Sequence, residues 1–202
     1  MAARIRLALA RDAREIAAIY RPFVESSVVS FEIAAPDSDE MARRITETSV
    51  SYPWLVCDID DRVAGYAYAT RHRVRAAYRW SVDTSVYVDG MYRRCGIGRG
   101  LYHSLFRILP VQGFFNAYAG ITLPNPASVA LHEAVGFTSI GVYRRVGYKL
   151  GAWHDVGWWQ LTLADHQAAP PDPLDMAAAR RHPAWESLLA SGQSRIRQEL
   201  PR

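Results

Sequence analysis

Two stretches of this sequence decide its fold: Asn125-Pro126-Ala127-Ser128-Val129-Ala130-Leu131-His132 and Arg93-Arg94-Cys95-Gly96-Ile97-Gly98. In the first, Asn125 is a favourable N-cap residue and Pro126 suits the first position of a helix. Helical spacing places the Asn125 amide, the Ser128 hydroxyl and the His132 imidazole on one face of that helix. Taken alone, this pattern is also consistent with a capped helix whose histidine simply has its hydrogen bonds satisfied.

The second stretch is a glycine loop that opens onto a helix. Gly96 and Gly98 have no Cβ, so backbone N–H groups can approach an anion closely, and the helix adds its dipole. Arg93, Arg94 and Arg99 add positive charge. The dinucleotide-binding fingerprint fits less well, because its third glycine and its early position in the chain are missing. Glycines also serve ordinary turns, but together the two stretches predict an enzyme that takes a group from a phosphorylated carrier.

The pattern around these stretches predicts a mixed α/β sheet with helices on both faces. Strands are expected over 4–10, 54–59, 63–70, 80–88, 115–123, 142–148 and 153–163. Helices are expected after Asp12, from about Asp37, after the glycine loop until Pro110 and Gly113, and from Asn125.

Three local signals support these elements. Asp12 and Glu15 have the spacing of a capping box at the start of the first helix. Glu40 is placed to meet Arg44 one turn later in the second helix. Asp60-Asp61 separates two strand-like runs and predicts a tight turn between them.

The composition limits the class of protein. The chain has 202 residues, half of them hydrophobic, and a net charge of +4, which suits one compact domain and gives no case for nucleic acid. No run is long enough to cross a bilayer, and no secretory signal is recognised. The two cysteines, Cys57 and Cys95, fit a reducing cytoplasm. The six histidines lack metal-site spacing, so no metal is expected.

The composition changes near residue 165. We expect a catalytic domain over 1–165 and a separate extension over 166–202. The extension begins with a Pro-rich linker, 168–173. The remainder is expected to be either one or two short helices with Trp185, Leu188 and Leu189 as an apolar patch, or a loose tail.

The motifs as a set resemble one enzyme family. Arg93-x-x-Gly96-x-Gly98 resembles the diphosphate loop of the GCN5-related N-acetyltransferase (GNAT) superfamily, and Asn125-x-x-Ser128 with His132 resembles its later coenzyme A helix. Within it, the chain resembles the phosphinothricin and methionine sulfoximine acetyltransferases over about 5–163. The matching stretches are Tyr52-Pro53-Trp54-Leu55-Val56, Ala64-Gly65-Tyr66-Ala67-Tyr68-Ala69, Ser85-Val86-Tyr87-Val88, Leu123-Pro124-Asn125-Pro126-Ala127-Ser128-Val129, Leu131-His132-Glu133-Ala134, Gly147-Tyr148-Lys149 and Trp153-His154-Asp155-Val156-Gly157.

The resemblance implies the GNAT fold, a homodimer, and direct transfer of an acetyl group from acetyl-CoA to a small primary amine. It implies an oxyanion stabilised by backbone N–H groups near Val86 to Val88. It also implies that His132 either donates a proton to the departing thiolate or orients a water molecule. The residues implied to contact acetyl-CoA are Val86, Tyr87, Val88, Arg93, Arg94, Cys95, Gly96, Ile97, Gly98, Arg99, Gly100, Asn125 and Ser128.

Asp83 stands where the family usually carries its general base, a glutamate. A base is required because the substrate amine is mostly ammonium at neutral pH. Aspartate is one methylene shorter, so a direct contact with the amine could become a water-bridged one. The alternative is that Asp83 only satisfies nearby backbone groups or an arginine.

The resemblance also implies an acceptor site for an amino-acid analogue with a second polar or anionic head. Arginines would hold its acidic groups and aromatic rings would form its walls. Each arginine could equally form a surface salt bridge. The implied acceptor residues are Phe31, Arg73, Arg75, Tyr78, Lys149 and His154.

Two other functions remain open at this stage. The acceptor could be another amine, such as a polyamine, an antibiotic or a protein N-terminus. The chain could instead be a non-catalytic sensor that binds acyl-CoA, with Asp83 as a sign of decay and the extension as its partner-binding element.

Overall fold

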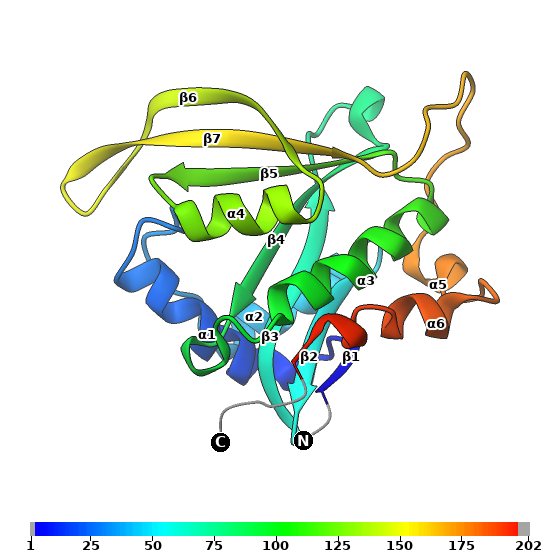
Figure 1. Cartoon of the computed structure of the whole chain (residues 1–202), viewed down its shortest axis with the longest axis horizontal. Coiled ribbons are helices and arrows are strands. Elements are labelled where there is room, and N and C mark those ends of the chain that lie inside the picture. Colours follow the sequence, from blue (N-terminus) through cyan, green and yellow to red (C-terminus); the bar gives the residue numbers. More distant parts are fainter. Residues whose placement is uncertain (1–2, 198–202) are drawn as a thin grey trace.

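The computed structural model describes residues 3–197, which form a layered α/β structure (Figure 1). The strands are β1 (Ala3–Leu7), β2 (Trp54–Ile59), β3 (Arg62–Arg71), β4 (Ser81–Val88), β5 (Asn116–Leu123), β6 (Thr138–Lys149) and β7 (Ala152–Thr162). The α-helices are α1 (Ala13–Glu25), α2 (Ser38–Thr48), α3 (Ile97–Gln112), α4 (Pro126–Ala134), α5 (Met176–Ala179) and α6 (Trp185–Ala190). Short 3₁₀ turns are η1 (Ala10–Asp12), η2 (Ala76–Tyr78), η3 (Gly90–Tyr92) and η4 (Gln193–Arg195).

The strands form a single mixed sheet, as the sequence predicts. The strand order is β1-β2-β3-β4-β5-β7-β6, with seven strands in the described part of the chain. Neighbouring strands are antiparallel except for β4 and β5, which are parallel. The crossover that parallel strands need is α3, which connects β4 to β5. The predicted order of strands and helices up to β7 is confirmed.

Helices cover both faces of the sheet. On one face, Leu101 and Leu105 of α3 pack against Leu55 and Val82 of the sheet. On the other, α1 and α2 bury a second apolar cluster that includes Ile45 and the strand residues Trp54, Val56 and Tyr66. Figure 1 shows α4 beside α3 on the first face. Within residues 3–197, no helix combines the length and the apolar character needed to cross a membrane.

The local signals are confirmed with one exception. Asp37 caps α2 by accepting from the Glu40 amide at 2.8 Å, and Arg44 meets Glu40 at 2.7 Å. The capping box at Asp12 is wrong, because the Asp12 side chain makes no cap hydrogen bond to α1. Its carboxylate instead accepts from the Leu9 amide and pairs with Arg6, which neutralises its charge.

The residues after β7 form short helices that join the main core. Met176 and Ala179 of α5, Trp185 and Leu189 of α6, and Ile196 are buried in the cluster beneath α3. This is the helical alternative of the two that the sequence leaves open. Residues 198–202 of the expected extension lie outside the described residues.

Candidate active site

The central cleft opens where β4 and β5 stop pairing. Their register covers only Ser81, Val82 and Asp83 against Asn116, Ala117 and Tyr118. Beyond that point the two strands run apart (Figure 1), and a cleft of about 60 Å³ lies between them. It is lined by Val29, Thr84, Ser85, Val86, Tyr87, Tyr102, Gly120, Ile121, Thr122, Asn125, Ser128 and His132. Strand separation thus exposes backbone of β4 that a continuous sheet would cover.

The face of α4 is assembled as the sequence predicts. The Asn125 side chain accepts from the Ser128 amide at 3.2 Å and caps the helix. Asn125, Ser128 and His132 all line the cleft. The shared face of these three side chains is therefore confirmed.

His132 is buried, with 5 % of its surface exposed, and both ring nitrogens have partners. Nδ1 lies 2.7 Å from the Ser128 carbonyl oxygen, so Nδ1 carries a proton and donates. Nε2 lies 3.0 Å from the Tyr102 hydroxyl, which then donates to it. Burial lowers the pKa of His132, so the neutral imidazole is favoured at neutral pH. This arrangement makes Tyr102 a partner of His132 in any proton transfer within the cleft.

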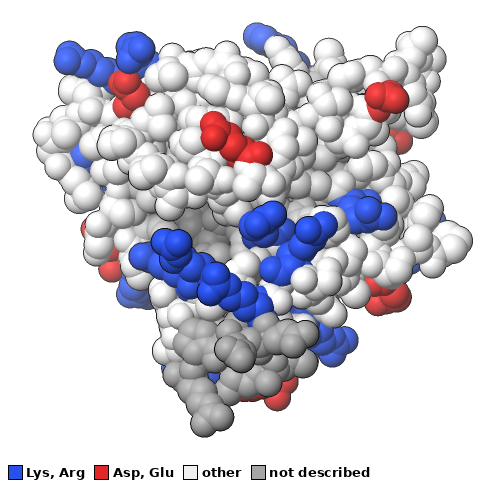
Figure 2. Space-filling view, in the orientation of Figure 1, with Lys and Arg blue, Asp and Glu red and all other residues white. Residues whose placement is uncertain are grey.

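The glycine loop has the backbone that its sequence predicts. Arg94 and Gly96 have φ of 62° and 84°, and Gly96 is the N-cap of α3. A Cβ on Gly98 would lie 3.1 Å from the Leu131 side chain, so this glycine allows α3 to approach α4. Figure 2 shows basic side chains gathered over the start of α3, beside a hollow in the surface. Free helix N–H groups and positive charge therefore meet at one edge of the cleft.

Asp83 is the last residue of β4 that pairs with β5, and it precedes Thr84, which lines the cleft. Side chains alternate along a strand, and Val82 packs under α3, so Asp83 lies on the opposite face, with α1 and α2. Its Oδ1 is 2.6 Å from Nδ1 of His72. Burial raises the pKa of Asp83, against the smaller lowering effects of His72 and Arg73. A carboxylate with a raised pKa beside a cleft is a candidate general base.

Three of the predicted acceptor residues meet between the segment that joins α1 to α2 and the β6–β7 hairpin. The Phe31 ring lies against Gly147, where an added Cβ would overlap it, and its centroid is 6.3 Å from that of His154. Lys149 is only 6 % exposed. Its Nζ donates to the carbonyl oxygens of Val24 and Ser30, so its hydrogen bonds tie the hairpin to α1.

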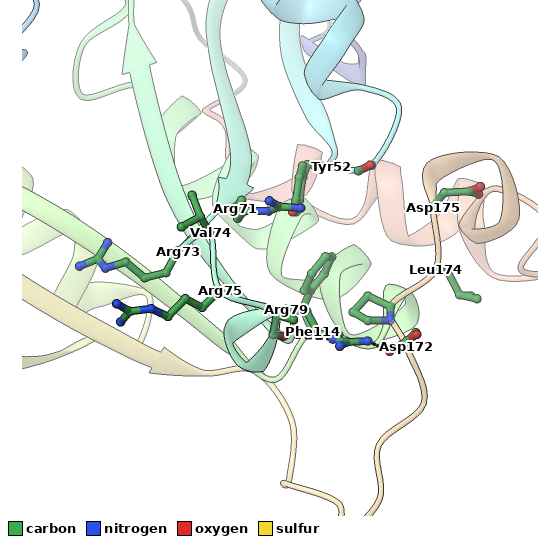
Figure 3. A pocket seen from close by; sticks show the side chains of 13 residues that line it. Tyr52, Arg71, Arg73, Val74, Arg75, Arg79, Phe114, Asp172, Leu174 and Asp175 are labelled. Atoms are coloured by element: carbon green, nitrogen blue, oxygen red, sulfur yellow. Dashed lines mark hydrogen bonds and ion pairs between the residues drawn. The ribbon is translucent and has the colours of Figure 1, made fainter.

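The other predicted acceptor residues lie in the 72–79 loop, between β3 and β4. Arg73 lies over the Trp158 ring, 5.4 Å from its centroid, and Tyr78 has its ring edge toward His72. Arg73 and Arg75 both border a cavity of about 400 Å³. Figure 3 shows them extending to the same side of the loop, away from Tyr52 and Phe114. The loop therefore presents two guanidinium groups on one side, and that of Arg73 acts on the carboxylate of Asp83.

Sequence reasoning did not single out His72 or Tyr102 as functional residues. Tyr102 follows Leu101 in a helix whose apolar spacing explains it as a core residue, and it is indeed buried. His72 lies in a loop, and only the register of β3 against β4 brings it to Asp83. The sequence offered one signal, because two positions depart from the family pattern together. Asp83 stands where the family usually carries glutamate, and His72 stands where a relative has tryptophan.

The sequence and fold of this chain match known proteins. The chain matches the family described as an Acetyltransferase (GNAT) domain over residues 5–158. It is 41 % identical to the phosphinothricin N-acetyltransferase of Streptomyces viridochromogenes, covering 84 % of this chain and 92 % of that protein. It is 34 % identical to an L-methionine sulfoximine/L-methionine sulfone acetyltransferase of Pseudomonas aeruginosa, covering 84 % and 100 %.

A solved structure agrees with the sequence comparisons. The Sinorhizobium meliloti phosphinothricin acetyltransferase, in complex with acetyl-CoA, superposes with a TM-score of 0.79 at 37 % identity, covering 86 % of this chain and 94 % of that one. The fold and these relatives together define an acetyltransferase. The chain belongs to the GNAT acetyltransferase family, and to the part of it that contains the phosphinothricin and methionine sulfoximine acetyltransferases.

Proposed function

We propose that this protein transfers the acetyl group of acetyl-CoA to the primary amine of a small amino-acid analogue, such as phosphinothricin or methionine sulfoximine. The relatives reported above are named for the acetylation of these two compounds. The observation that carries the proposal for this chain is the position of Asp83, a carboxylate with a raised pKa at the end of the β4–β5 cleft.

Acetyl-CoA is assigned to the cleft and to the start of α3. Backbone N–H groups of residues 93–100 bind the diphosphate, helped by the arginines there. The exposed edge of β4 at Val86, Tyr87 and Val88 binds the pantetheine arm, and Asn125 and Ser128 contact it from α4. The fit rests on the positive φ of Arg94 and Gly96 at the start of α3 and on the edge of β4 that β5 leaves unpaired.

The proposed reaction divides its proton transfers between the two faces of the sheet. Asp83 removes a proton from the substrate ammonium, and the free amine attacks the thioester carbon. Backbone N–H groups of β4 stabilise the oxyanion. When the carbon–sulfur bond breaks, the thiolate takes the hydroxyl proton of Tyr102, and the attacking nitrogen loses its second proton to solvent as the amide forms. Solvent then returns a proton to Tyr102, and Asp83 releases its proton before the next turnover. Tyr102 lines the cleft, and its hydroxyl group also contacts the His132 imidazole.

The acceptor is assigned to the region between the 72–79 loop and the β6–β7 hairpin. Arg73 and Arg75 suit the acidic groups of the substrate, while Phe31, Tyr78 and His154 form walls. Lys149 holds the hairpin in place rather than meeting the acceptor, because its Nζ is engaged by two backbone carbonyls.

We also infer that the protein is a homodimer in the cytoplasm. The outer strand β6 and its hairpin carry apolar side chains that are each at least 40 % exposed: Ile140, Val142, Tyr143, Val146, Tyr148, Leu150 and Trp153. A surface of this kind marks a protein–protein contact. Cys57 and Cys95 are both free and buried, which suits a reducing compartment.

The direct test is release of free coenzyme A thiol from acetyl-CoA across a panel of amines. Release with phosphinothricin or methionine sulfoximine, and formation of the N-acetyl product by mass spectrometry, is the expected result. Release only with polyamines, aminoglycosides or peptide N-termini would move the assignment to another acceptor. Tight binding of coenzyme A without release on any amine would identify a non-catalytic sensor.

A further inference from the structure

The base Asp83 has a partner that is held unusually firmly. His72 directly follows β3, is 10 % exposed, and contacts Asp83 Oδ1 through Nδ1 at 2.6 Å. Its ring stacks on Tyr118, with centroids 4.2 Å apart and planes at 17°. The edges of Tyr78 and Trp158 close two further sides. The imidazole is thus fixed by packing as well as by its hydrogen bond.

This hydrogen bond divides the two carboxylate oxygens between different tasks. A neutral imidazole protonated on Nδ1 donates to Oδ1, which leaves Oδ2 to accept. We propose that His72 is a positioning residue for acetyl transfer, which holds Asp83 Oδ1 so that Oδ2 receives the proton of the substrate ammonium. The inference rests on the proposed function, since it assigns a partner to the same base.

The groups around the His72–Asp83 pair determine how loss of the His72 hydrogen bond would change the ionisation of Asp83. The charged or titratable groups that act on the pair are Arg73 from the same loop, Tyr78 of η2, Tyr118 of β5 and Tyr68 of β3. Of these, only Arg73 carries a charge at neutral pH. The hydrogen bond from His72 lowers the pKa of Asp83 against the effect of burial. Without His72, Asp83 should therefore ionise only at higher pH.

Two substitutions separate the hydrogen bond from the packing. His72→Phe keeps a ring to stack on Tyr118 but cannot donate to Asp83. His72→Asn gives up the stacking but retains an N–H donor. The control is His166→Phe, since His166 also stacks on an aromatic ring, Phe115, and bonds to Asn116 rather than Asp83.

The measurement is kcat against pH with both substrates saturating. For His72→Phe we expect the acidic limb of the profile to move to higher pH and kcat at pH 7 to fall about tenfold or more. His72→Asn should recover much of that loss, and His166→Phe should match the wild type. If the acidic limb of the pH profile does not move in His72→Phe, or if His72→Asn is as impaired as His72→Phe, the role of His72 is overturned while the proposed function stands. Absence of thiol release by the wild type would overturn the proposed function with it.

A second observation, independent of the first, concerns the segment 189–197, which we call the C-terminal strap. This segment lies beyond the matched family region, 5–158. The Ser104 hydroxyl of α3 donates to the Leu189 carbonyl and accepts from the Gly192 amide. The Arg197 amide donates to the Cys95 carbonyl at 2.9 Å. Gln193 also accepts from the Ile5 amide, which anchors the strap to β1.

The strap covers the side of the glycine loop that faces away from the cleft. A Cβ on Gly96 would lie 2.3 Å from the Arg195 carbonyl oxygen, and one on Gly100 would lie 2.7 Å from that of Gly192. A Cβ on Gly98 would instead point at Leu131 and Val86, on the cleft side. We infer that the strap is a positioning element, which holds the diphosphate loop in its binding conformation from behind. This also rests on the proposed function.

Glycine-to-alanine substitutions test the strap with a matched control. In Gly192→Ala the new Cβ would lie 1.9 Å from the Gly100 carbonyl oxygen, whereas Gly90→Ala would meet nothing within 4 Å. Ser104→Ala removes the two hydrogen bonds more gently and serves if Gly192→Ala does not fold. We expect weaker acetyl-CoA binding by calorimetry, about tenfold for Gly192→Ala, since a loop that must be ordered costs affinity.

The strap should affect binding and not the chemical step. KM for acetyl-CoA should rise in Gly192→Ala and Ser104→Ala, while kcat at saturation stays near the wild-type value, and Gly90→Ala should change neither. Folded strap variants with wild-type affinity would overturn this inference alone. No affinity of the wild type for acetyl-CoA would overturn the proposed function as well.

Discussion

At the scale of single residues, Asp83 and Tyr102 divide the proposed proton transfers between two faces of one strand. Asp83 lies on the α1–α2 face with His72, and Tyr102 lies on the α3 face with His132. The gap between β4 and β5 connects the two. A substitution of either residue should therefore impair the chemistry without removing the groups assigned to the diphosphate.

Asp83→Asn tests the base. Asparagine keeps the shape and can still accept from His72, but it cannot take up a proton. We expect kcat at pH 7 to fall by about 10²- to 10⁴-fold, while the Kd for acetyl-CoA stays within about twofold, because binding energy resides in other groups. Steady-state thiol release and calorimetry give the two numbers. Equal turnover in the two proteins would remove Asp83 from the mechanism.

Asp83 also sets a pH dependence in the wild type. Because burial raises its pKa, the ionised base is lost as pH falls through that raised value, at a higher pH than for an exposed aspartate. The rate should decline with acidification accordingly. In Asp83→Asn no carboxylate titrates at this position. We therefore expect the rate of the variant to rise by about tenfold per pH unit, following only the fraction of substrate amine that is unprotonated. A wild-type profile with the shape of the variant's would contradict this.

Tyr102→Phe tests the proton donor on the other face. The substitution removes the hydroxyl that donates to His132 Nε2. We expect kcat to fall about tenfold or more with KM for acetyl-CoA little changed, and a loss of about 1–3 kcal/mol in unfolding free energy from the unpaired buried nitrogen. Tyr66→Phe, in the core on the opposite face, is the control and should keep its kcat. A fully active Tyr102→Phe would leave the thiolate to be protonated by water.

At the scale of elements, most of the fold follows from the sequence because each element carries its own signal. The Asp60-Asp61 turn adopts positive φ at both residues, as a two-residue hairpin requires. Gly113 is the C-cap of α3, as the sequence predicts. The helix passes through Pro110 and ends at Gln112, which is fully buried and donates to the Ser51 and Leu174 carbonyls.

What the sequence could not supply depends on contacts between distant elements. The failure of the Asp12 capping box is such a case, since Arg6 and Leu9 claim the carboxylate. The His72–Asp83 pair depends on strand register, and Lys149 is committed to carbonyls more than a hundred positions away. Periodicity reports which face of an element is buried, but not which side chain on another element meets it.

Asn125→Ala tests α4 as an element that both folds and binds. Loss of the cap should cost about 1 kcal/mol of unfolding free energy. Asp37→Ala removes the equivalent cap from α2 and should cost about as much. Only Asn125→Ala should weaken acetyl-CoA binding, because α4 lines the cleft and α2 contributes no residue to it. Thermal unfolding and calorimetry on both variants separate the two roles, and equal acetyl-CoA affinity in all three proteins would limit Asn125 to capping.

At the scale of the whole molecule, the β6–β7 hairpin connects the exposed apolar surface to the proposed acceptor site. Trp153 and Tyr148 are both well exposed and contact each other edge to face, with their ring centroids 5.3 Å apart. Next to Trp153 is His154, which meets Phe31. A partner that covers the hairpin would therefore also steady one wall of the proposed acceptor site.

Trp153→Arg should consequently change assembly and acceptor binding together. A charge at the centre of an apolar contact costs several kcal/mol, so we expect a monomer by sedimentation at concentrations where the wild type is a dimer. KM for the amine should rise while KM for acetyl-CoA stays the same, because the diphosphate loop lies on another part of the fold. Val50→Arg places the same charge at an exposed apolar residue between α2 and β2 and should leave both properties unchanged. A monomeric wild type with full activity would show that the hairpin surface serves something other than self-association.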